Sequence, residues 1–426
     1  MTTTTTTAEP APAVTDETRA RDFVAKLAAR DFDAAVATFD DKMREAMPKE
    51  KLAAAWAQIE AGLGAFKQID SVAVQSTEGL RIAVTKASFE RATATLRIVL
   101  DAQNRVAGFF VAPGDSASAW KPPPYADATR FEDKRVAIGA SPALPGTLSI
   151  PKGASHYPIV VLVHGSGPND EDETIGALKP FKDLAFGLAS RGVAVLRYDK
   201  RTRVDPSNVK TQKEEVEDAA HAAIAFARAL PDVDPTRVAL LGHSQGGFLA
   251  PRIAKGDPSI RRLVILAGST RPLEDSLLAQ MKYMATLKPN EPAIAKAIAD
   301  AQRFKKDVES PALKPTDAVQ VPFGSSIPGS YFLDVRGYHP ERVAATLTIP
   351  MLVLQGERDY QVTIAEDFAG WKRTLGTKKN AKLVTYPTLD HAFTEGGTPP
   401  APSDYERPAN VDEKVVKDIA DFLLAP

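Results

Sequence analysis

The sequence predicts an α/β fold in which a mostly parallel sheet is covered by helices, carries an inserted helical cap and follows a small α+β domain. From about Arg130 onward, short and fully apolar runs alternate with helical stretches. Continuous apolar runs indicate strands covered on both faces, and their alternation with helices is typical of parallel sheets. Before that point, helical patterns are followed by β-rich segments, and later an interval of about 80 residues interrupts the alternation. These three observations predict the small domain, the large domain and its cap.

The composition excludes several classes of site and partner. The chain has 426 residues, of which 44% are hydrophobic, and its 53 Lys and Arg residues against 54 Asp and Glu residues leave a net charge of −1. At roughly 150 residues per domain, this length predicts two or three domains. The sequence contains no Cys, which excludes disulfides, zinc–thiolate sites, iron–sulfur clusters and a Cys nucleophile. A near-neutral chain has no general attraction for polyanions, so we expect no nucleic-acid partner.

The first 14 residues combine a Thr tract with Ala and Pro. Such a composition cannot bury a core, so residues 1–14 are predicted to be a disordered linker. The segment lacks the basic start and apolar core of a signal peptide, and no apolar run in the chain is long enough for a membrane span. Because similar tracts often follow a cleaved export signal, two locations stay open: the periplasm or medium after export, and the cytoplasm.

Residues 15–113 are predicted to form an α+β accessory domain. Helical spacing recurs around Phe23, over 32–43 and over 52–63. The β-rich segments that follow are 68–77, 81–90, 92–100 and 105–113, with a hairpin turn predicted at 101–104. This order resembles the nuclear-transport-factor-2-like fold and a small domain of unknown function that precedes hydrolase domains in some bacterial secreted proteins. No polar constellation with catalytic spacing is present, so we expect a binding, positioning or dimerisation role, the last through a homodimer of this domain.

A Pro-rich segment, residues 114–129, is predicted to be a stiff connection to a second domain over residues 130–426. The predicted buried strands of that domain are 159–163, 193–197, 238–242, 263–268, 351–356 and 381–388. The predicted helices are 178–190, 213–229 and 411–424. The interval at about 270–345 contains two helical patterns and a stretch rich in Pro, Gly and aromatic residues. An insertion of this size commonly covers an active site, so a cap is predicted there.

The strongest motif is Gly242-His243-Ser244-Gln245-Gly246, which stands directly after an apolar run and directly before a helical pattern. A G-x-S-x-G motif between a strand and a helix has the context of a nucleophile elbow, in which a sharp turn exposes the Ser side chain. The turn is so tight that a Cβ at either Gly would meet neighbouring backbone, and the Ser itself adopts a strained conformation. Ser244 is therefore the predicted nucleophile.

A serine hydroxyl near neutral pH needs a base and a group that orients the base. Asp359 and His391 each follow a predicted strand of the parallel sheet, at the edge where Ser244 also lies. Among the six His residues, His391 alone both follows the acid and stands at a strand end, so it is the predicted base. Asp359 is the predicted acid, with Glu357 as the alternative. Asp390 is disfavoured because adjacent side chains in a loop rarely make the required bond to the imidazole Nδ1.

The predicted oxyanion hole uses backbone N–H donors, because the tetrahedral intermediate carries a negative charge. One donor is the residue after the nucleophile, Gln245. The other is expected in the Gly-containing loop His164-Gly165-Ser166-Gly167, which follows an apolar run. In that loop Ser166 is the first choice and Gly167 the next.

Other polar and aromatic groups have simpler interpretations. The charged run at 170–173 is interpreted as surface or loop salt bridges, and the charged run at 198–201 as a structural charge network. No matching set of His or carboxylate residues indicates a metal, and no cofactor is expected. Packing is the default explanation for aromatic residues in a cap. The candidate substrate contacts there are Tyr331, Phe332, Tyr338 and His339.

The segments HGSGPNDEDETIG, LRYDKRT, GHSQGG, LQGERDYQV and LDHAF resemble the serine hydrolases of the α/β-hydrolase superfamily, in particular the bacterial branch called serine aminopeptidase-like or dienelactone-hydrolase-like. The resemblance covers about 300 residues. It implies the nucleophile, acid, base and oxyanion roles at Ser244, Asp359, His391, Ser166 and Gln245. The loop has a single HG-x-G in place of the HGGG of the hormone-sensitive-lipase branch, and dienelactone hydrolases proper use a Cys that this chain lacks.

The resemblance implies hydrolysis of a small-molecule carboxylic ester through an acyl-enzyme, without a metal or an organic cofactor. A peptidase or aminopeptidase and a thioesterase use the same triad, since amides, thioesters and esters share the tetrahedral intermediate. A binding module with an inactive hydrolase domain is the alternative from a different class. The substrate depends on the cap and pocket, which the motifs do not specify.

Overall fold

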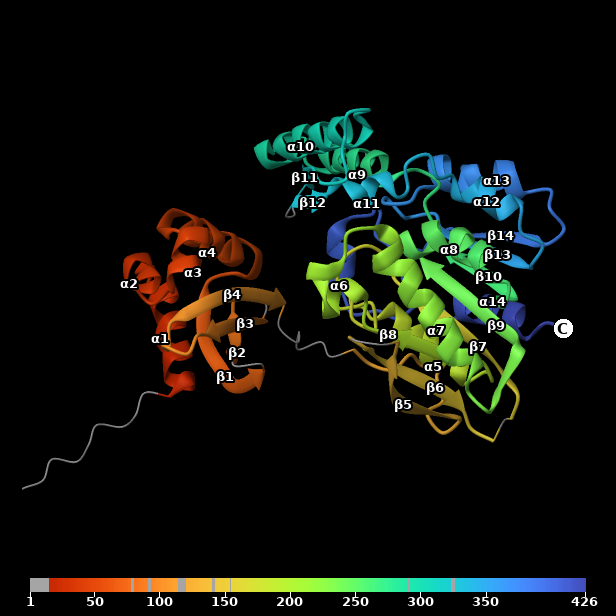
Figure 1. Ribbon diagram of the computed structural model, residues 1–426, viewed down its shortest axis with the longest axis horizontal. Helices are drawn as coiled ribbons and strands as arrows, with labels where there is room; N and C mark the ends of the chain where they lie inside the picture. The colour runs from red at the N-terminus through yellow and green to blue at the C-terminus, as the bar shows by residue number, and fades with distance from the viewer. Residues whose placement is uncertain are drawn as a thin grey trace, which may run out of the picture. The chain divides into compact units, whose positions relative to one another are not determined.

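The computed structural model describes residues 15–77, 80–90, 93–113, 120–139, 142–153, 155–289, 291–322 and 326–426. The chain divides into two compact units, Met1–Ala119 and Trp120–Pro426 (Figure 1). The linker predicted over residues 1–14 lies outside the described residues, as does the 114–119 part of the predicted Pro-rich connection. The two units are therefore described one at a time.

The first unit packs helices on a four-stranded antiparallel sheet. Its helices are α1 (Asp16–Ala28), α2 (Phe32–Ala37), α3 (Asp41–Ala46) and α4 (Lys49–Leu63). Its strands, in the sheet order β1-β2-β3-β4, are β1 (Phe66–Thr77), β2 (Leu80–Phe89), β3 (Thr93–Leu100) and β4 (Val106–Pro113). Phe23, Phe39 and Trp56 are fully buried in its own apolar core.

The helical pattern predicted over 32–43 is broken into two helices. The side chain of Asp40 accepts a hydrogen bond of 2.7 Å from the N–H of Met43 and so caps a new helix, α3. Thr38 ends α2, and the N–H of Asp40 bonds instead to the carbonyl of Val106 in β4. Side-chain capping competes with helix continuation, which the apolar spacing alone does not reveal.

The second unit contains an eight-stranded sheet in the order β14-β13-β10-β9-β7-β8-β6-β5. The strands are β5 (Phe131–Ile138), β6 (Leu144–Pro151), β7 (Tyr157–Val163), β8 (Ala194–Tyr198), β9 (Val233–His243), β10 (Arg262–Leu266), β13 (Met351–Gly356) and β14 (Ala381–Tyr386). In this sheet β7, β8, β9, β10, β13 and β14 pair in parallel, whereas β5 pairs with β6, and β6 with β8, in the antiparallel sense. The predicted fold class is confirmed.

Helices cover both faces of this sheet. One face packs against α5 (Pro180–Ala189) and α14 (Glu413–Leu424), and the other against α7 (Asp218–Arg228), α8 (Gln245–Gly256), α12 (Pro340–Ala345) and α13 (Ala369–Leu375). Alternate residues of one strand enter the two cores: Val161 belongs to one cluster and Leu162 to the other. Burial on both faces explains why these strands are continuous apolar runs.

The interval between β10 and β13 forms a separate layer with its own small core (Figure 1). It contains α9 (Leu273–Leu287), α10 (Pro292–Glu309), β11 (Ala318–Gln320), β12 (Ser326–Pro328) and α11 (Gly329–Leu333). We call these elements the cap. The predicted interval extended to about residue 345, but α12 packs on α8, and its Ala344 lies in the core of the sheet.

The segment from Trp120 to Thr129, expected to be part of the connection, packs on the second unit. The indole N–H of Trp120 donates to Asp183 at 2.7 Å, and the hydroxyl of Tyr125 donates to the carbonyl of Val411 at 2.7 Å. Among the helices of the described residues, none is long and apolar enough to cross a membrane.

Candidate active site

Ser244 occupies the turn between β9 and α8. Its φ of 51° and ψ of −113° lie in a region that L-residues rarely adopt. A Cβ at Gly246 would stand 2.2 Å from the carbonyl oxygen of Val163, and one at Gly242 would stand 2.3 Å from the carbonyl oxygen of Gly246. The crowding expected at both glycines is therefore present. The neighbouring backbone holds a strained turn that presents a half-buried Ser244 side chain at the strand end.

His391 and Asp359 meet at the edge of the sheet where Ser244 lies. The Nδ1 of His391 donates to Oδ2 of Asp359 at 2.7 Å, and both side chains are buried. The same Oδ2 accepts from the side-chain amide of Gln355 at 2.9 Å. Oδ1 accepts from the N–H groups of Gln361 and Val362 at 2.8 and 2.9 Å. With four donors the carboxylate is held in place and its buried charge is compensated.

The two competing carboxylates lie elsewhere. Glu357 is exposed and accepts a hydrogen bond of 2.7 Å from the hydroxyl of Thr385. Asp390 closes its own turn by accepting from the N–H groups of Ala392 and Thr394. Among the described residues, neither carboxylate forms a hydrogen bond or ion pair with the imidazole of His391, so the geometry favours Asp359 over both.

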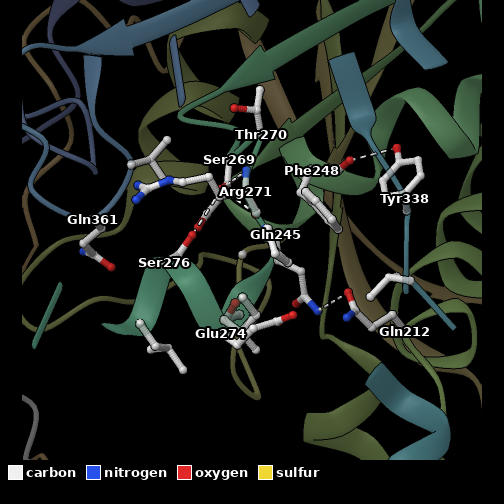
Figure 2. A pocket seen from close by; sticks show the side chains of 18 of the residues that line it. Gln212, Gln245, Phe248, Ser269, Thr270, Arg271, Glu274, Ser276, Tyr338 and Gln361 are labelled. Atoms are coloured by element: carbon white, nitrogen blue, oxygen red, sulfur yellow. Dashed lines mark hydrogen bonds between the residues drawn. The ribbon is translucent and has the colours of Figure 1, made fainter. Parts of the chain in front are cut away.

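A cavity of about 600 Å³ opens beside these residues and contains Ser244, Gln245 and His391 in its lining. Figure 2 shows Glu274 and Ser276 of α9 on one side of it, and Phe248 and Tyr338 on another. The cap therefore contributes a wall of the cavity, as an insertion at this place was expected to do. The larger apolar lining residues are Ile175, Phe248, Leu273, Leu277, Val308, Phe332, Val335 and Val362.

The predicted substrate contacts separate into two groups. Phe332, Tyr338 and His339 line the cavity, whereas Tyr331 does not. The side chain of Tyr331 is buried, and its hydroxyl donates to Glu215. Burial, together with the negative charge of Glu215, holds the pKa of Tyr331 well above its usual value, so this hydroxyl keeps its proton.

The candidate oxyanion residues also separate. Ser166 and Gln245 line the cavity together with Ser244, and Gly167 is not in its lining. Within the described ranges, neither the N–H of Ser166 nor that of Gln245 donates to a protein acceptor. Two free backbone donors beside a candidate nucleophile are what an oxyanion hole requires.

A buried polar network lies behind Gln245. Lys200 is 2% exposed, and its ammonium donates to the carbonyl oxygen of Gly165 at 2.7 Å and to Oε1 of Gln245 at 2.8 Å. It also forms an ion pair of 3.0 Å with Oε1 of Glu215. The side-chain amide of Gln245 donates in turn to the hydroxyl of Tyr331 at 2.8 Å and to Oε2 of Glu215 at 3.2 Å. We call Lys200, Glu215, Gln245 and Tyr331 the buried network.

Sequence reasoning placed Lys200 in a structural charge network and left it out of the site. Lys200 is the second residue after β8, a strand that pairs in parallel with β7, so it stands at the same sheet edge as Ser244. The strand-end argument that selected Asp359 and His391 would have selected it too. Although burial opposes ionisation, Lys200 and the hydrogen bonds from Tyr331 and Gln245 hold the pKa of Glu215 below its usual value.

Glu173 corrects the interpretation of the 170–173 run as surface or loop salt bridges. It is 1% exposed, its Oε1 accepts from the N–H of Gly165 at 2.5 Å, and its Oε2 lies 3.0 Å from Nδ1 of His243. Burial is the largest single influence and lowers the pKa of His243. The charge and hydrogen bond of Glu173, the carbonyl of His391 and the charge of Asp359 together outweigh it, so the net shift of this pKa is upward. The Nε2 of His243 lies 2.9 Å from the carbonyl oxygen of His391, so this pair supports the loop that carries His391.

His164 is also buried, but its pKa is shifted in the opposite direction from that of His243. Its ring packs between Phe181 and Tyr198, at centroid distances of 5.0 and 5.3 Å. Burial lowers the pKa of His164 to about 4, so the ring is neutral near pH 7. Within the described ranges, no group of three or more His, Asp or Glu side chains is arranged to hold a metal ion.

Comparisons with known proteins match both units. Residues 20–109 match the family described as "Protein of unknown function (DUF3887)", and residues 160–407 match the family described as "Alpha/beta hydrolase family". The chain is 33% identical to esterase EstD of Thermotoga maritima over 405 residues, which cover 94% of each chain. It is 27% identical to the quorum-quenching protein AidA of Acinetobacter baumannii over 46% of this chain and 68% of that protein. The solved structure of Est1E from Butyrivibrio proteoclasticus is similar with a TM-score of 0.45 and 21% identity, covering 68% of this chain and 97% of that one.

Proposed function

Because the chain belongs to the alpha/beta hydrolase family, we propose that it hydrolyses carboxylic esters with Ser244 as nucleophile, His391 as general base and Asp359 as the acid that orients His391. Its full-length similarity to an esterase supports ester hydrolysis. The observation that carries the assignment of roles is the 2.7 Å bond between His391 and Asp359 beside the cavity that contains Ser244.

In the first half of the reaction, the Oγ of Ser244 attacks the ester carbonyl while His391 takes its proton at Nε2. Asp359 keeps the other proton on Nδ1 and stabilises the imidazolium that forms. The carbonyl oxygen becomes an oxyanion and is bound by the N–H groups of Ser166 and Gln245. The intermediate then expels the alcohol, which receives its proton from His391.

In the second half, a water molecule repeats the attack on the acyl-enzyme. His391 takes the proton of the water, the tetrahedral intermediate forms again in the same oxyanion hole, and Ser244 leaves with the proton returned by His391. In both halves, His391 accepts each transferred proton and then passes it on.

The cavity supports an ester with an apolar acyl or aromatic part, since Phe248, Leu277 and Phe332 are among the residues that line it. A small-molecule ester is therefore the proposed partner. Esters, thioesters and aminoacyl amides share the intermediate, so a panel of these three classes ranked by kcat/KM tests the ester assignment. Thioesters or amides ranked above esters would contradict it.

Labelling with a fluorophosphonate, together with turnover of a chromogenic ester, tests the assigned nucleophile. Wild-type protein should be labelled at Ser244 and turn over the ester, and Ser244→Ala should do neither. Ser190→Ala is the control: Ser190 is a buried, hydrogen-bonded serine at the end of α5, outside the cavity lining. Folded wild-type protein that neither labels nor turns over any ester would indicate a binding module instead.

A further inference from the structure

We propose that Lys200 is a positioning residue of the oxyanion hole. Its single ammonium group binds the peptide group that carries the Ser166 N–H and the side chain of Gln245, the residue that carries the other N–H donor. This inference rests on the proposed function of Ser244, Ser166 and Gln245. Lys200 does not itself line the cavity. It acts through two residues that do, by way of the peptide group after Gly165 and the side chain of Gln245.

The first contact acts on the Ser166 donor directly. The carbonyl oxygen of Gly165 and the N–H of Ser166 belong to one peptide group, which is planar and in which the two bonds point in opposite directions. The ammonium of Lys200 bonds to that oxygen at 2.7 Å. It therefore fixes the direction of the Ser166 N–H, and by drawing electron density to the oxygen it makes that N–H a stronger donor.

The second contact holds the other donor. The Oε1 of Gln245 accepts from the same ammonium at 2.8 Å, while its Nε2 donates to the hydroxyl of Tyr331 at 2.8 Å. Both ends of the side-chain amide are thus bound. Gln245 is the first residue of α8, so an anchored side chain also fixes the backbone N–H that faces the cavity.

The charge balance of the buried network fits this role. An ammonium has three protons, and Lys200 has three acceptors: Gly165, Gln245 and Glu215. Glu215 supplies the opposite charge at 3.0 Å, so neither member of this buried ion pair is left without a partner. The hydroxyl of Tyr331 donates to the same carboxylate, which ties the cap to the oxyanion hole.

Gly165 is held from its other side as well. Its N–H donates to Oε1 of Glu173 at 2.5 Å, and its carbonyl accepts from Lys200. A Cβ at this position would stand 3.1 Å from both Glu173 Oε1 and Ser244 Cβ. The loop is therefore clamped by two buried charged side chains, close to the nucleophile.

The test is Lys200→Met, assayed per active site after the sites have been counted by complete fluorophosphonate labelling. We expect kcat to fall by about 10- to 100-fold with KM changed less than about 3-fold, because the lost stabilisation belongs to the transition state. The affinity for a trifluoromethyl ketone, whose adduct carries an oxyanion, should fall by a similar factor. Lys378→Met is the matched control, since Lys378 is half-buried and donates to the carbonyl of Ala345 away from the cavity.

Tyr331→Phe is a milder variant that tests the same network if Lys200→Met does not fold. It removes one hydroxyl and should lower kcat per site by roughly 3- to 10-fold, with a matching loss of ketone affinity. Tyr125→Phe removes a part-buried hydroxyl bond, to Val411, and should leave both quantities unchanged.

The results at Lys200 and Tyr331 test the positioning role, and the result at Ser244 tests the proposed function. A Lys200→Met or Tyr331→Phe protein that keeps wild-type kcat per site and ketone affinity, or loses activity only in proportion to its folded fraction, overturns the role of Lys200. If Ser244→Ala retains turnover and labelling, the proposed function fails, whatever the result at Lys200.

Discussion

The Nδ1 of His391 and the Oδ2 of Asp359 are 2.7 Å apart, although 32 residues separate them in the chain. They meet because each follows a neighbouring parallel strand, β14 and β13 respectively, whose carboxyl ends lie at one edge of the sheet. Gln355 and two backbone N–H groups complete the hydrogen bonding of Asp359. This carboxylate therefore has one orientation, and it fixes the tautomer of His391.

Asp359→Asn should lower kcat for a chromogenic ester by roughly 10³- to 10⁴-fold, because the amide no longer enforces the required imidazole tautomer. Glu357→Gln is the control and should stay near the wild-type rate, since Glu357 is exposed and bonded to Thr385. Steady-state kinetics on both variants measures the difference. Equal losses, or a larger loss at Glu357, would contradict the assignment of the acid.

Gly246→Ala should disrupt the elbow, because its Cβ would stand 2.2 Å from the carbonyl oxygen of Val163. We expect the free energy of unfolding to fall by about 2 kcal/mol or more, with ester turnover lowered over 100-fold. Gly192→Ala is the comparison: Gly192 has a φ of +91° but no atom within 4 Å of an added Cβ. It should cost about 1–2 kcal/mol and keep the wild-type kcat. Denaturant titration and kinetics distinguish the two.

His164 should make the protein sensitive to mild acid. Its pKa is lowered by burial from 6.5 to about 4 in the folded protein, so its contribution to stability is present above pH 6.5. It is lost as the pH falls toward 4, where the unfolded chain binds a proton that the folded chain does not. The loss is on the order of 3 kcal/mol. His164→Phe should show a shallower fall in unfolding free energy between pH 6.5 and 4, and parallel curves for both proteins would refute this.

Phe332→Ala should raise KM for a long-chain or aromatic ester by about 5- to 20-fold with little change in kcat, because Phe332 lines the cavity but is assigned no part in the chemical steps. Phe304→Leu controls for loosening of the cap. Phe304 packs against Phe332 at a centroid distance of 5.3 Å but is absent from the cavity lining. A similar rise in KM in both variants would show that the effect comes from cap packing.

A chain that begins at Trp120 should fold and retain ester turnover within about 3-fold of the full-length rate, since each unit has its own apolar core. The cut must precede Trp120, whose indole bonds to Asp183. We propose that the first unit binds, positions or dimerises the enzyme. Sedimentation of both chains tests dimerisation, and loss of turnover in a folded shortened chain would refute the independence of the second unit.

The sequence by itself determined the fold class of the second unit and singled out Ser244, Asp359 and His391. This was possible because doubly covered strands are continuous apolar runs and because parallel strands bring their carboxyl ends to one edge. The strands β5 and β6 were not predicted. β5 is largely exposed along its length, so it lacks the apolar run that marks the other strands. Likewise, Asp40 divides a helix that apolar spacing predicted as one.

Only the tertiary structure decided which buried charges surround the site. Glu215 and Tyr331 are 116 residues apart, and Lys200 and Gln245 are 45 apart, so no local pattern connects them. A charged residue in a sequence is exposed by default, and the run that contains Glu173 was interpreted accordingly. The run that contains Lys200 was interpreted as a structural charge network, but its partners were not identified. Burial of a charge becomes favourable only when distant segments supply its partners. Those partners come together only when the chain is folded. The contacts of Glu173 and Lys200 with the loop 164–167 could therefore not be predicted from the residues of that loop alone.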